Sequence, residues 1–116
     1  ALTAGAAWLP WVLWRMDEFY AMTKGGEKVQ LDDQPSAYFL RQGFVSIESD
    51  EHLSKYVVQE LGDDLLVFST DYPHGDSRWP DSVDAFLELP LSDEEKRKIL
   101  WDNCARFYAM EVPASV

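Results

Sequence analysis

The sequence predicts an α/β fold in which short parallel strands alternate with helices. Two β-rich segments, 43–49 and 65–70, are each followed by residues with helical spacing or helix-start signals. The second segment, LLVFST, has apolar residues at consecutive positions, a pattern typical of a strand buried on both faces. Because a helical crossover follows the first strand, the two strands are expected to be parallel.

Two helices are predicted before the first strand. Apolar side chains recur at helical spacing over about 9–22, behind Pro10, a residue that suits the first helical position. The polar stretch 23–35 contains a pair of glycines and is predicted as a loop. Pro35 is expected to open a short helix that runs through Arg41.

The first strand, 43–49, is predicted to lead directly into a helix. Ser49 or Asp50 is of a type that caps a helix, and Gly62 is expected to end it. The apolar positions of this helix are Leu53, Tyr56, Val57 and Leu61.

Two further helices are predicted after the second strand. Pro80 is expected to start a short helix that extends through Glu88. Ser92 and Glu95, three residues apart, form a capping box for a final helix ending near Tyr108. The apolar stripe of that helix is Ile99, Leu100, Cys104 and Phe107.

Composition and charge exclude several classes of partner. The 116 residues are 47% hydrophobic, enough for a packed core, and carry a formal net charge of −11. Such a chain offers no basic patch that could neutralise phosphates, so no nucleic-acid partner is expected. The apolar N-terminal stretch runs for only 14 residues before Arg15, and Pro10 interrupts it, so no membrane span is expected. The single cysteine, Cys104, favours a reducing, cytoplasmic location.

Two parallel strands do not make a self-sufficient sheet, because both outer edges and much of the surface stay uncovered. Either further strands come from partner copies, or residues 1–116 are a piece of a larger α/β protein. We expect the second arrangement. No composition shift suggests a domain boundary, so residues 1–116 are predicted to be one segment.

Asp71 is the main candidate for a chemical role. In parallel α/β folds, the loops at the carboxyl ends of strands form the ligand face, and Asp71 lies directly after the second strand. A carboxylate there can bind a divalent metal or act as a base. Its alternative role is structural, in an Asx-type turn before Pro73. His74 is the better histidine for a second polar contact, because His52 falls in the first turn of a predicted helix.

Two linked motifs carry a resemblance to a known family. VFSTDYPHGDSRWPDSV, followed by LSDEEKRKILWDNCARFYAM, resembles the C-terminal end of the amidohydrolase-related (amidohydrolase 2) family. Its members are metal-dependent TIM-barrel hydrolases and decarboxylases similar to aminocarboxymuconate-semialdehyde decarboxylase. The pattern [GS]-S-D-[YFW]-P-H corresponds to residues 69–74, and the family's terminal helix pattern, which begins L-S and ends N-A-x-R-x-[YF], to residues 91–108. The upstream AGAAWLPWVLWRMDEFY resembles the segment after barrel strand six.

The resemblance implies the C-terminal portion of a (β/α)8 TIM barrel, with strands seven and eight and their flanking helices. Asp71 corresponds to the strand-eight aspartate that binds the metal or carries a proton. His74 is a second candidate catalytic residue. Asn103 and Arg106 match the terminal helix motif and are expected to tie that helix to the barrel.

The resemblance also implies a divalent metal, with zinc the leading candidate. The family's other ligands are an H-x-H pair after strand one and a histidine on strand five, and this chain has only His52 and His74. A catalytic zinc needs about three protein ligands, so Asp71 alone would not hold one. We therefore expect metal, and activity, only when the rest of the barrel or other copies complete the site.

Two functions follow as alternatives. The first is part of a metal-dependent enzyme that hydrolyses or decarboxylates a small carboxylic or cyclic compound. The second is a non-catalytic structural or binding module that assembles as a homo-oligomer.

Trp8, Trp11 and Trp14 could line an aromatic ligand pocket, but core packing of an outer helix is the preferred interpretation. Cys104 is expected to be a buried, inert thiol.

Overall fold

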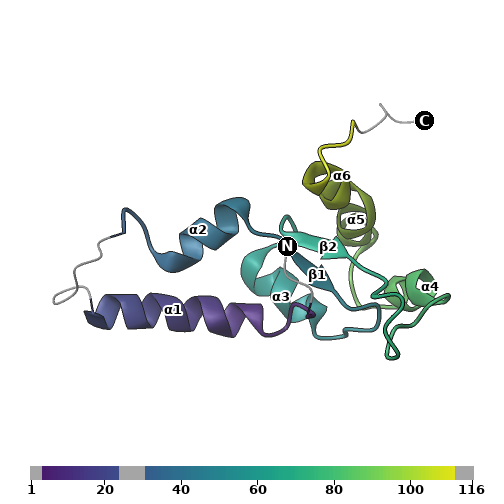
Figure 1. The fold of residues 1–116 in the computed structure, drawn as a ribbon, viewed down its shortest axis with the longest axis horizontal. Coiled ribbons are helices and arrows are strands. Elements are labelled where there is room, and N and C mark those ends of the chain that lie inside the picture. The colour runs from purple at the N-terminus through teal and green to yellow at the C-terminus, as the bar shows by residue number, and fades with distance from the viewer. Residues whose placement is uncertain (1–3, 24–30, 112–116) are drawn as a thin grey trace.

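The structure, a computed structural model, describes residues 4–23 and 31–111 and has the predicted alternation of helices and strands. Part of the predicted loop 23–35 lies outside the described residues. The elements in chain order (Figure 1) are α1 (Leu9–Thr23), α2 (Pro35–Gln42), β1 (Val45–Ile47), α3 (Ser54–Leu61), β2 (Leu66–Phe68), α4 (Ser82–Leu87), α5 (Asp93–Arg97), η1 (Lys98–Asp102) and α6 (Asn103–Phe107).

The two strands pair in parallel, as predicted. Val45 lies opposite Leu66 and Ile47 opposite Phe68, so both strands end at the same edge of the sheet. Each strand has three residues, fewer than the apolar segments that predicted it. A ladder extends only as far as both chains stay side by side, and the residues after both strands depart into loops.

The hydrophobic core lies where the helices pack against this small sheet. Val45, Ile47 and Leu66 are completely buried, as expected for strands covered by crossover helices. Helices on both sides of the strands in the sequence contribute to the same cluster: Leu9 and Leu13 from α1, Val57 from α3, Phe86 from α4 and Ile99 from η1.

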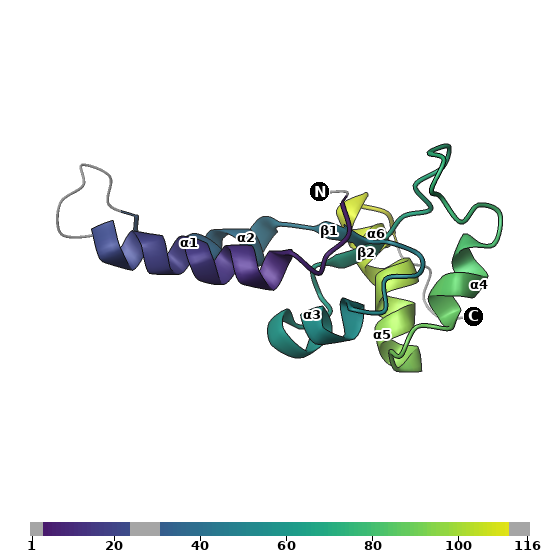
Figure 2. The ribbon, with the colours of Figure 1, turned by 90° about the horizontal axis from the view of Figure 1, so that it is seen from below.

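Helices α1 and α2 form an arm that extends away from the sheet. They run side by side in both ribbon views (Figures 1 and 2). The Ser36 backbone N–H and hydroxyl donate to the two oxygens of Asp17, at 2.9 and 2.6 Å. This pair attaches the start of α2 to the middle of α1.

The predicted burial of the tryptophans is wrong for two of the three. Trp11 and Trp14 are 63% and 52% exposed, whereas Trp8 is half-buried. The core-facing positions of α1 are Leu9 and Leu13, four residues apart, so Trp11 lies on the other side of the helix. Trp11 and Trp14 instead line an open pocket of about 470 Å³ between α1 and α3.

The start of α3 also differs from the prediction. The helix begins at Ser54, and its N-cap residue Leu53 makes no side-chain cap. Residues 48–53 form successive turns, which carry the chain past Ser49 and Asp50 before the helix starts. The predicted end is confirmed: Gly62 has φ +79°, a backbone conformation that favours glycine, and its N–H donates to the Val58 carbonyl.

The C-terminal helix is continuous through α5, η1 and α6, and its start is confirmed. Glu95 N–H donates to Ser92 Oγ at 3.2 Å, and Ser92 N–H donates to Glu95 Oε2 at 2.6 Å. The η1 segment is a π-helix, which rotates the following residues relative to a regular α-helical stripe. Cys104 is consequently only half-buried, contrary to the prediction, while Asn103 is fully enclosed.

Within residues 4–23 and 31–111, no helix is long and apolar enough to cross a membrane.

Candidate active site

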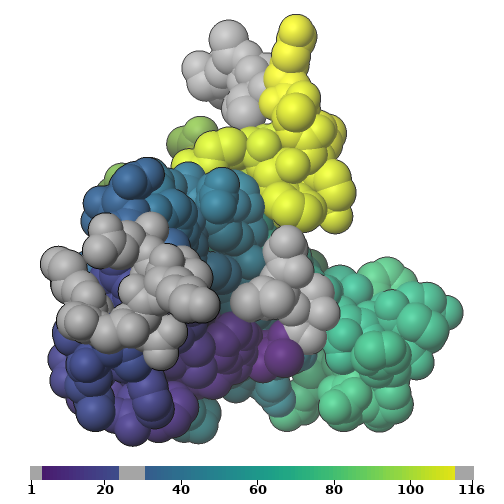
Figure 3. All heavy atoms as spheres, turned by 60° about the vertical axis from the view of Figure 1, so that its left-hand side comes forward, coloured from purple at the N-terminus to yellow at the C-terminus, as the bar shows by residue number. Residues whose placement is uncertain are grey.

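The loop after β2 carries the charged cluster that the sequence analysis singled out. Ser69 Oγ accepts a hydrogen bond from the Asp71 backbone N–H at 3.2 Å, and Ser77 Oγ donates to the Thr70 carbonyl at 2.6 Å. The Ser77 hydroxyl joins the far end of the loop to its beginning, near the carboxyl edge of the sheet. In the space-filling view the green segment after β2 protrudes from the body, apart from the arm of α1 and α2 (Figure 3).

Asp71 has an unusual backbone conformation. Its φ is +57°, in the left-handed region that aspartate tolerates better than most residues. Non-glycine residues in this region cluster at functional sites, where the surrounding structure holds them in place. The Asp71 side chain is 29% exposed, so it is sheltered yet open to a small ligand.

Asp71 and His74 are brought together, as their spacing suggested. His74 Nδ1 lies 3.1 Å from Asp71 Oδ2, so the ring donates to the carboxylate when Nδ1 carries the proton. That arrangement leaves Nε2 as a free acceptor or metal ligand. Within the described residues the Asp71 carboxylate accepts no backbone N–H, so the alternative Asx-type turn is not observed.

Asp76 joins this pair and was not singled out as a site residue from the sequence. One ligand atom each from Asp71, His74 and Asp76 lie within 4.8 Å of one another. Atoms bound to one divalent ion at about 2.0–2.2 Å can be no further apart than about 4.4 Å, so a small adjustment would suit such an ion. His74 and Asp76 are exposed, however, and Asp71 is the most sheltered of the three.

A second strand end contributes another carboxylate that the sequence analysis missed. Glu48 directly follows β1 and is half-buried. Burial raises the pKa of the Glu48 carboxyl above its ordinary value, and the charges of Asp71 and Asp76 raise the pKa further. Glu48 therefore lies near the same acidic cluster. The sequence signal that could have identified Glu48 is its position as an acidic residue directly after the first of the two parallel strands.

Glu51 holds the loop after β1 against the segment that precedes α1. Its Oε1 accepts from the Ala6 and Ala7 backbone N–H groups at 2.8 and 2.7 Å. Its Oε2 accepts from the Glu48 backbone N–H at 3.2 Å. Gly5, with φ +67°, passes so close that an added Cβ would lie 3.1 Å from Glu51 Oε1. One carboxylate thus connects two loops at the carboxyl edge of the sheet.

An exposed aromatic pair adjoins the cluster on the same loop. The rings of Tyr72 and Trp79 lie 5.5 Å apart between centroids and are tilted by 56°. Arg78, beside Trp79, pairs with Asp50 of the other loop at 2.6 Å. The edge of the site therefore combines aromatic faces with carboxylates, and an ion pair connects its two loops.

Similarity to known proteins identifies the family of this chain. The amidohydrolase family matches residues 3–110, which is nearly the whole chain. The chain belongs to the amidohydrolase family. Its match includes both strands, the candidate loop and the C-terminal helix.

Among curated members of this family, a gamma-resorcylate decarboxylase of Polaromonas sp. (strain JS666) is 24% identical over 104 residues. That match covers 88% of this chain and 31% of the relative.

Solved structures of amidohydrolase-type decarboxylases share the fold. The 5-carboxyvanillate decarboxylase of Sphingomonas paucimobilis superposes with a TM-score of 0.79 at 22% identity, over 94% of this chain and 33% of its own. The dihydroxybenzoic acid decarboxylase of Polaromonas sp. JS666, solved with manganese and the inhibitor 2-nitroresorcinol, gives 0.72 at 23% identity, over 92% and 33%. These relatives are TIM barrels, and this chain spans about a third of their length.

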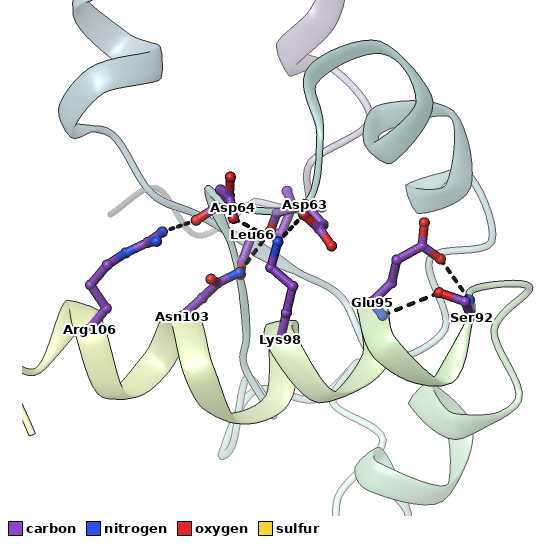
Figure 4. A network of polar contacts seen from close by, with 8 residues as sticks. All are labelled: Asp63, Asp64, Leu66, Ser92, Glu95, Lys98, Asn103 and Arg106. Carbon is purple, nitrogen blue, oxygen red and sulfur yellow. Dashed lines mark hydrogen bonds and ion pairs between the residues drawn. The ribbon is translucent and has the colours of Figure 1, made fainter. Parts of the chain in front are cut away.

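In this member of the amidohydrolase family, the C-terminal helix is tied to β2 and the residues before it, as predicted for Asn103. The buried Asn103 amide donates to the carbonyls of Asp63 and Leu66, at 2.7 and 2.8 Å (Figure 4). Arg106 donates to the Asp64 carbonyl, and Lys98 Nζ contacts the Asp64 carboxylate at 2.7 Å. These contacts hold the helix at the amino end of β2, the end opposite Asp71.

Proposed function

We propose that this chain forms part of a metal-dependent decarboxylase that acts on a small aromatic carboxylic acid. The observation that carries the proposal is Asp71, a sheltered carboxylate in a left-handed conformation at the carboxyl end of β2, in contact with His74. Similarity to decarboxylases of gamma-resorcylate and 5-carboxyvanillate favours this reaction over hydrolysis. The exposed rings of Tyr72 and Trp79 offer aromatic faces next to the cluster.

The proposal includes the place of the chain in the barrel. β1 and β2 are assigned as strands seven and eight, and the remaining strands and ligands come from the rest of a barrel or from other copies. In the described part of the chain both outer edges of the β1–β2 sheet are open, which supports this assignment because strands that lack neighbours on their outer sides are rarely stable alone. A cytoplasmic location, inferred from the single cysteine, belongs to the same proposal.

The reaction defines what the site residues must do. Decarboxylation breaks the bond between the ring and the carboxylate carbon, releases CO₂ and leaves the electron pair on the ring carbon, which then takes a proton. A bound divalent ion would polarise oxygen atoms of the substrate. Asp71 would hold that ion, and His74, in contact with Asp71 Oδ2, would fix the direction of the carboxylate. The aromatic pair would orient the ring.

The identity of the metal is part of the proposal. Zinc was expected from the family resemblance, whereas solved relatives contain manganese. Carboxylate oxygens suit manganese, and an imidazole nitrogen suits zinc. We therefore propose a divalent ion bound through Asp71, with His74 and Asp76 within reach as further donors.

Metal content tests the proposal most directly. We expect about one manganese or zinc ion per chain, measured by plasma mass spectrometry on protein produced from its complete natural gene, and loss of that ion in Asp71→Asn. Asp81→Asn is the matched control, because Asp81 is exposed and its side chain caps no helix. The wild type should also release CO₂ from hydroxybenzoic acids, and Asp71→Asn should not.

Three results would contradict the proposal. Equal metal content in the wild type and Asp71→Asn would show that Asp71 is not a metal ligand. Metal binding without CO₂ release from any aromatic acid, combined with hydrolysis of a cyclic amide or ester, would replace decarboxylation by hydrolysis. Absence of both metal and activity would favour the non-catalytic oligomeric module, for which the exposed Trp11 and Trp14 are the supporting observation.

A further inference from the structure

Glu48 is the acidic residue that directly follows β1 at the carboxyl edge of the sheet. Strand residues alternate between faces, and Val45 and Ile47 point into the core. Continued alternation directs Glu48 to the opposite face, as it does Ser46. Because Ile47 pairs with Phe68, the residues that follow both strands come out next to each other at the carboxyl edge.

The backbone of Glu48 is fixed by a neighbouring side chain. Glu51 Oε2 accepts its N–H, while Glu51 Oε1 accepts two N–H groups from the segment before α1. The oxygens of Glu51 are therefore occupied by backbone donors. The Glu48 carboxylate accepts a hydrogen bond from the Gly5 backbone N–H, but in the described part of the protein it makes no hydrogen bond or ion pair with another side chain.

Three acidic side chains act on Glu48. Burial raises the pKa of the Glu48 carboxyl most, the charges of Asp71, Glu51 and Asp76 raise it further, and a hydrogen bond from the Gly5 backbone N–H lowers it. A substrate carboxylate placed beside Glu48 would meet the same repulsion. A neutral hydroxyl placed there would instead donate a hydrogen bond to a charged acceptor, which is a strong contact.

We propose that Glu48 is a specificity-determining residue that accepts a hydrogen bond from a hydroxyl group on the ring of the aromatic acid. This inference rests on the proposed function. Glu48, after β1, accepts the hydrogen bond from the ring hydroxyl, while Asp71, after β2, holds the metal ion. Repulsion by Glu48 prevents the acid from binding in the opposite orientation, with its carboxylate beside Glu48. The site thereby selects hydroxylated aromatic acids over unsubstituted ones.

Substrate preference tests this role. On protein produced from the complete natural gene, kcat/KM is measured for 2,6-dihydroxybenzoate and for benzoate in the wild type, Glu48→Gln and Glu48→Asp. We expect the preference for the hydroxylated acid to fall about tenfold or more in Glu48→Gln, because the charged acceptor is lost. Glu48→Asp should retain more of the preference than Glu48→Gln. An unchanged preference in Glu48→Gln would overturn the proposal.

A binding measurement separates failure of this proposal from failure of the proposed function. Resorcinol carries the hydroxyl groups without a carboxylate, and its dissociation constant can be measured by calorimetry even in a protein that releases no CO₂. We expect the constant to rise about tenfold in Glu48→Gln and to stay unchanged in Asp81→Asn. Equal resorcinol binding in the wild type and Glu48→Gln would refute the role of Glu48, whatever the activity. Unaltered thermal unfolding of both variants would show that the fold is retained.

Discussion

Single carboxylates organise the carboxyl edge of the β1–β2 sheet, and each does so differently. Asp71 is held in a left-handed conformation and contacts His74. Glu51 is used structurally, since its oxygens accept N–H groups from two separate loops. Glu48 is half-buried and is left without a side-chain partner in the described residues. Residue type alone does not distinguish these roles, because all three are acids in loops.

Replacement of Glu51 should destabilise the protein. In Glu51→Gln an amide NH₂ replaces one acceptor oxygen, so at least one backbone N–H of Ala6, Ala7 or Glu48 loses its partner. We expect a loss of about 1–3 kcal/mol in the free energy of unfolding, measured by urea denaturation. Glu60→Gln, an exposed change in α3, should alter stability by less than about 0.5 kcal/mol. Equal stability of the two variants would refute a structural role for Glu51.

At the scale of elements, the C-terminal helix depends on contacts at several points along its length. The capping box of Ser92 and Glu95 starts it, Asn103 binds two carbonyls at the amino end of β2, and Lys98 pairs with Asp63 and Asp64 (Figure 4). The π-helical segment η1 lies between the cap and Asn103. Cys104 donates from Sγ to the Ile99 carbonyl, five residues earlier, which matches the wider π turn.

Removal of the cap should weaken this helix by a predictable amount. Ser92→Ala deletes the oxygen that accepts the Glu95 N–H, and we expect a loss of about 1 kcal/mol in the free energy of unfolding. Ser92→Thr keeps the hydroxyl and should lie close to the wild type. Chemical denaturation followed by circular dichroism measures both. A Thr variant as unstable as the Ala variant would show that the hydroxyl does not act as the cap.

The Lys98 ion pairs should produce a pH-dependent contribution. Hydrogen bonding and attraction by Lys98 lower the pKa of Asp64 in the folded protein, so this contribution is present above the unfolded Asp pKa of about 3.9 and is lost as the pH falls further. The pKa of Lys98 is raised by Asp63 and Asp64, so its contribution persists until alkaline pH. Asp64 is largely exposed, so we expect Lys98→Met to cost less than about 1 kcal/mol near pH 7.

The difference between the wild type and Lys98→Met should therefore be constant from about pH 6 to 9 and shrink below about pH 4. Thermal unfolding at a series of pH values measures this difference. A difference that grows on acidification would contradict the assigned direction of the Asp64 pKa.

The whole molecule is extended and leaves much apolar surface uncovered. Its radius of gyration is 16.3 Å, compared with about 13–14 Å for a compact domain of this length. The arm of α1 and α2 accounts for the long dimension (Figure 2). Both outer edges of the two-stranded sheet are open within the described residues, and Trp11 and Trp14 are exposed on α1.

We expect the 116-residue chain, studied by itself, to associate into dimers or larger assemblies, because open strand edges and exposed aromatic surface favour association. Sedimentation velocity at micromolar concentration measures this. The double variant Trp11→Glu, Trp14→Glu separates the two causes: a monomer would assign association to α1, and persistent assembly would assign it to the strand edges. A well-ordered wild-type monomer would contradict the expectation.

Local patterns were sufficient for the elements and for the main candidate residue. Periodicity predicted α1 within one residue of its observed end, Ser92 and Glu95 predicted the last helix start, and the end of an apolar strand singled out Asp71. These features depend on residues adjacent in the chain. The position of Glu48 beside Asp71, the exposure of Trp11, and the binding of Ala6 by Glu51 depend on which elements pack together. Only the tertiary structure decides them, because such contacts join residues far apart in the sequence.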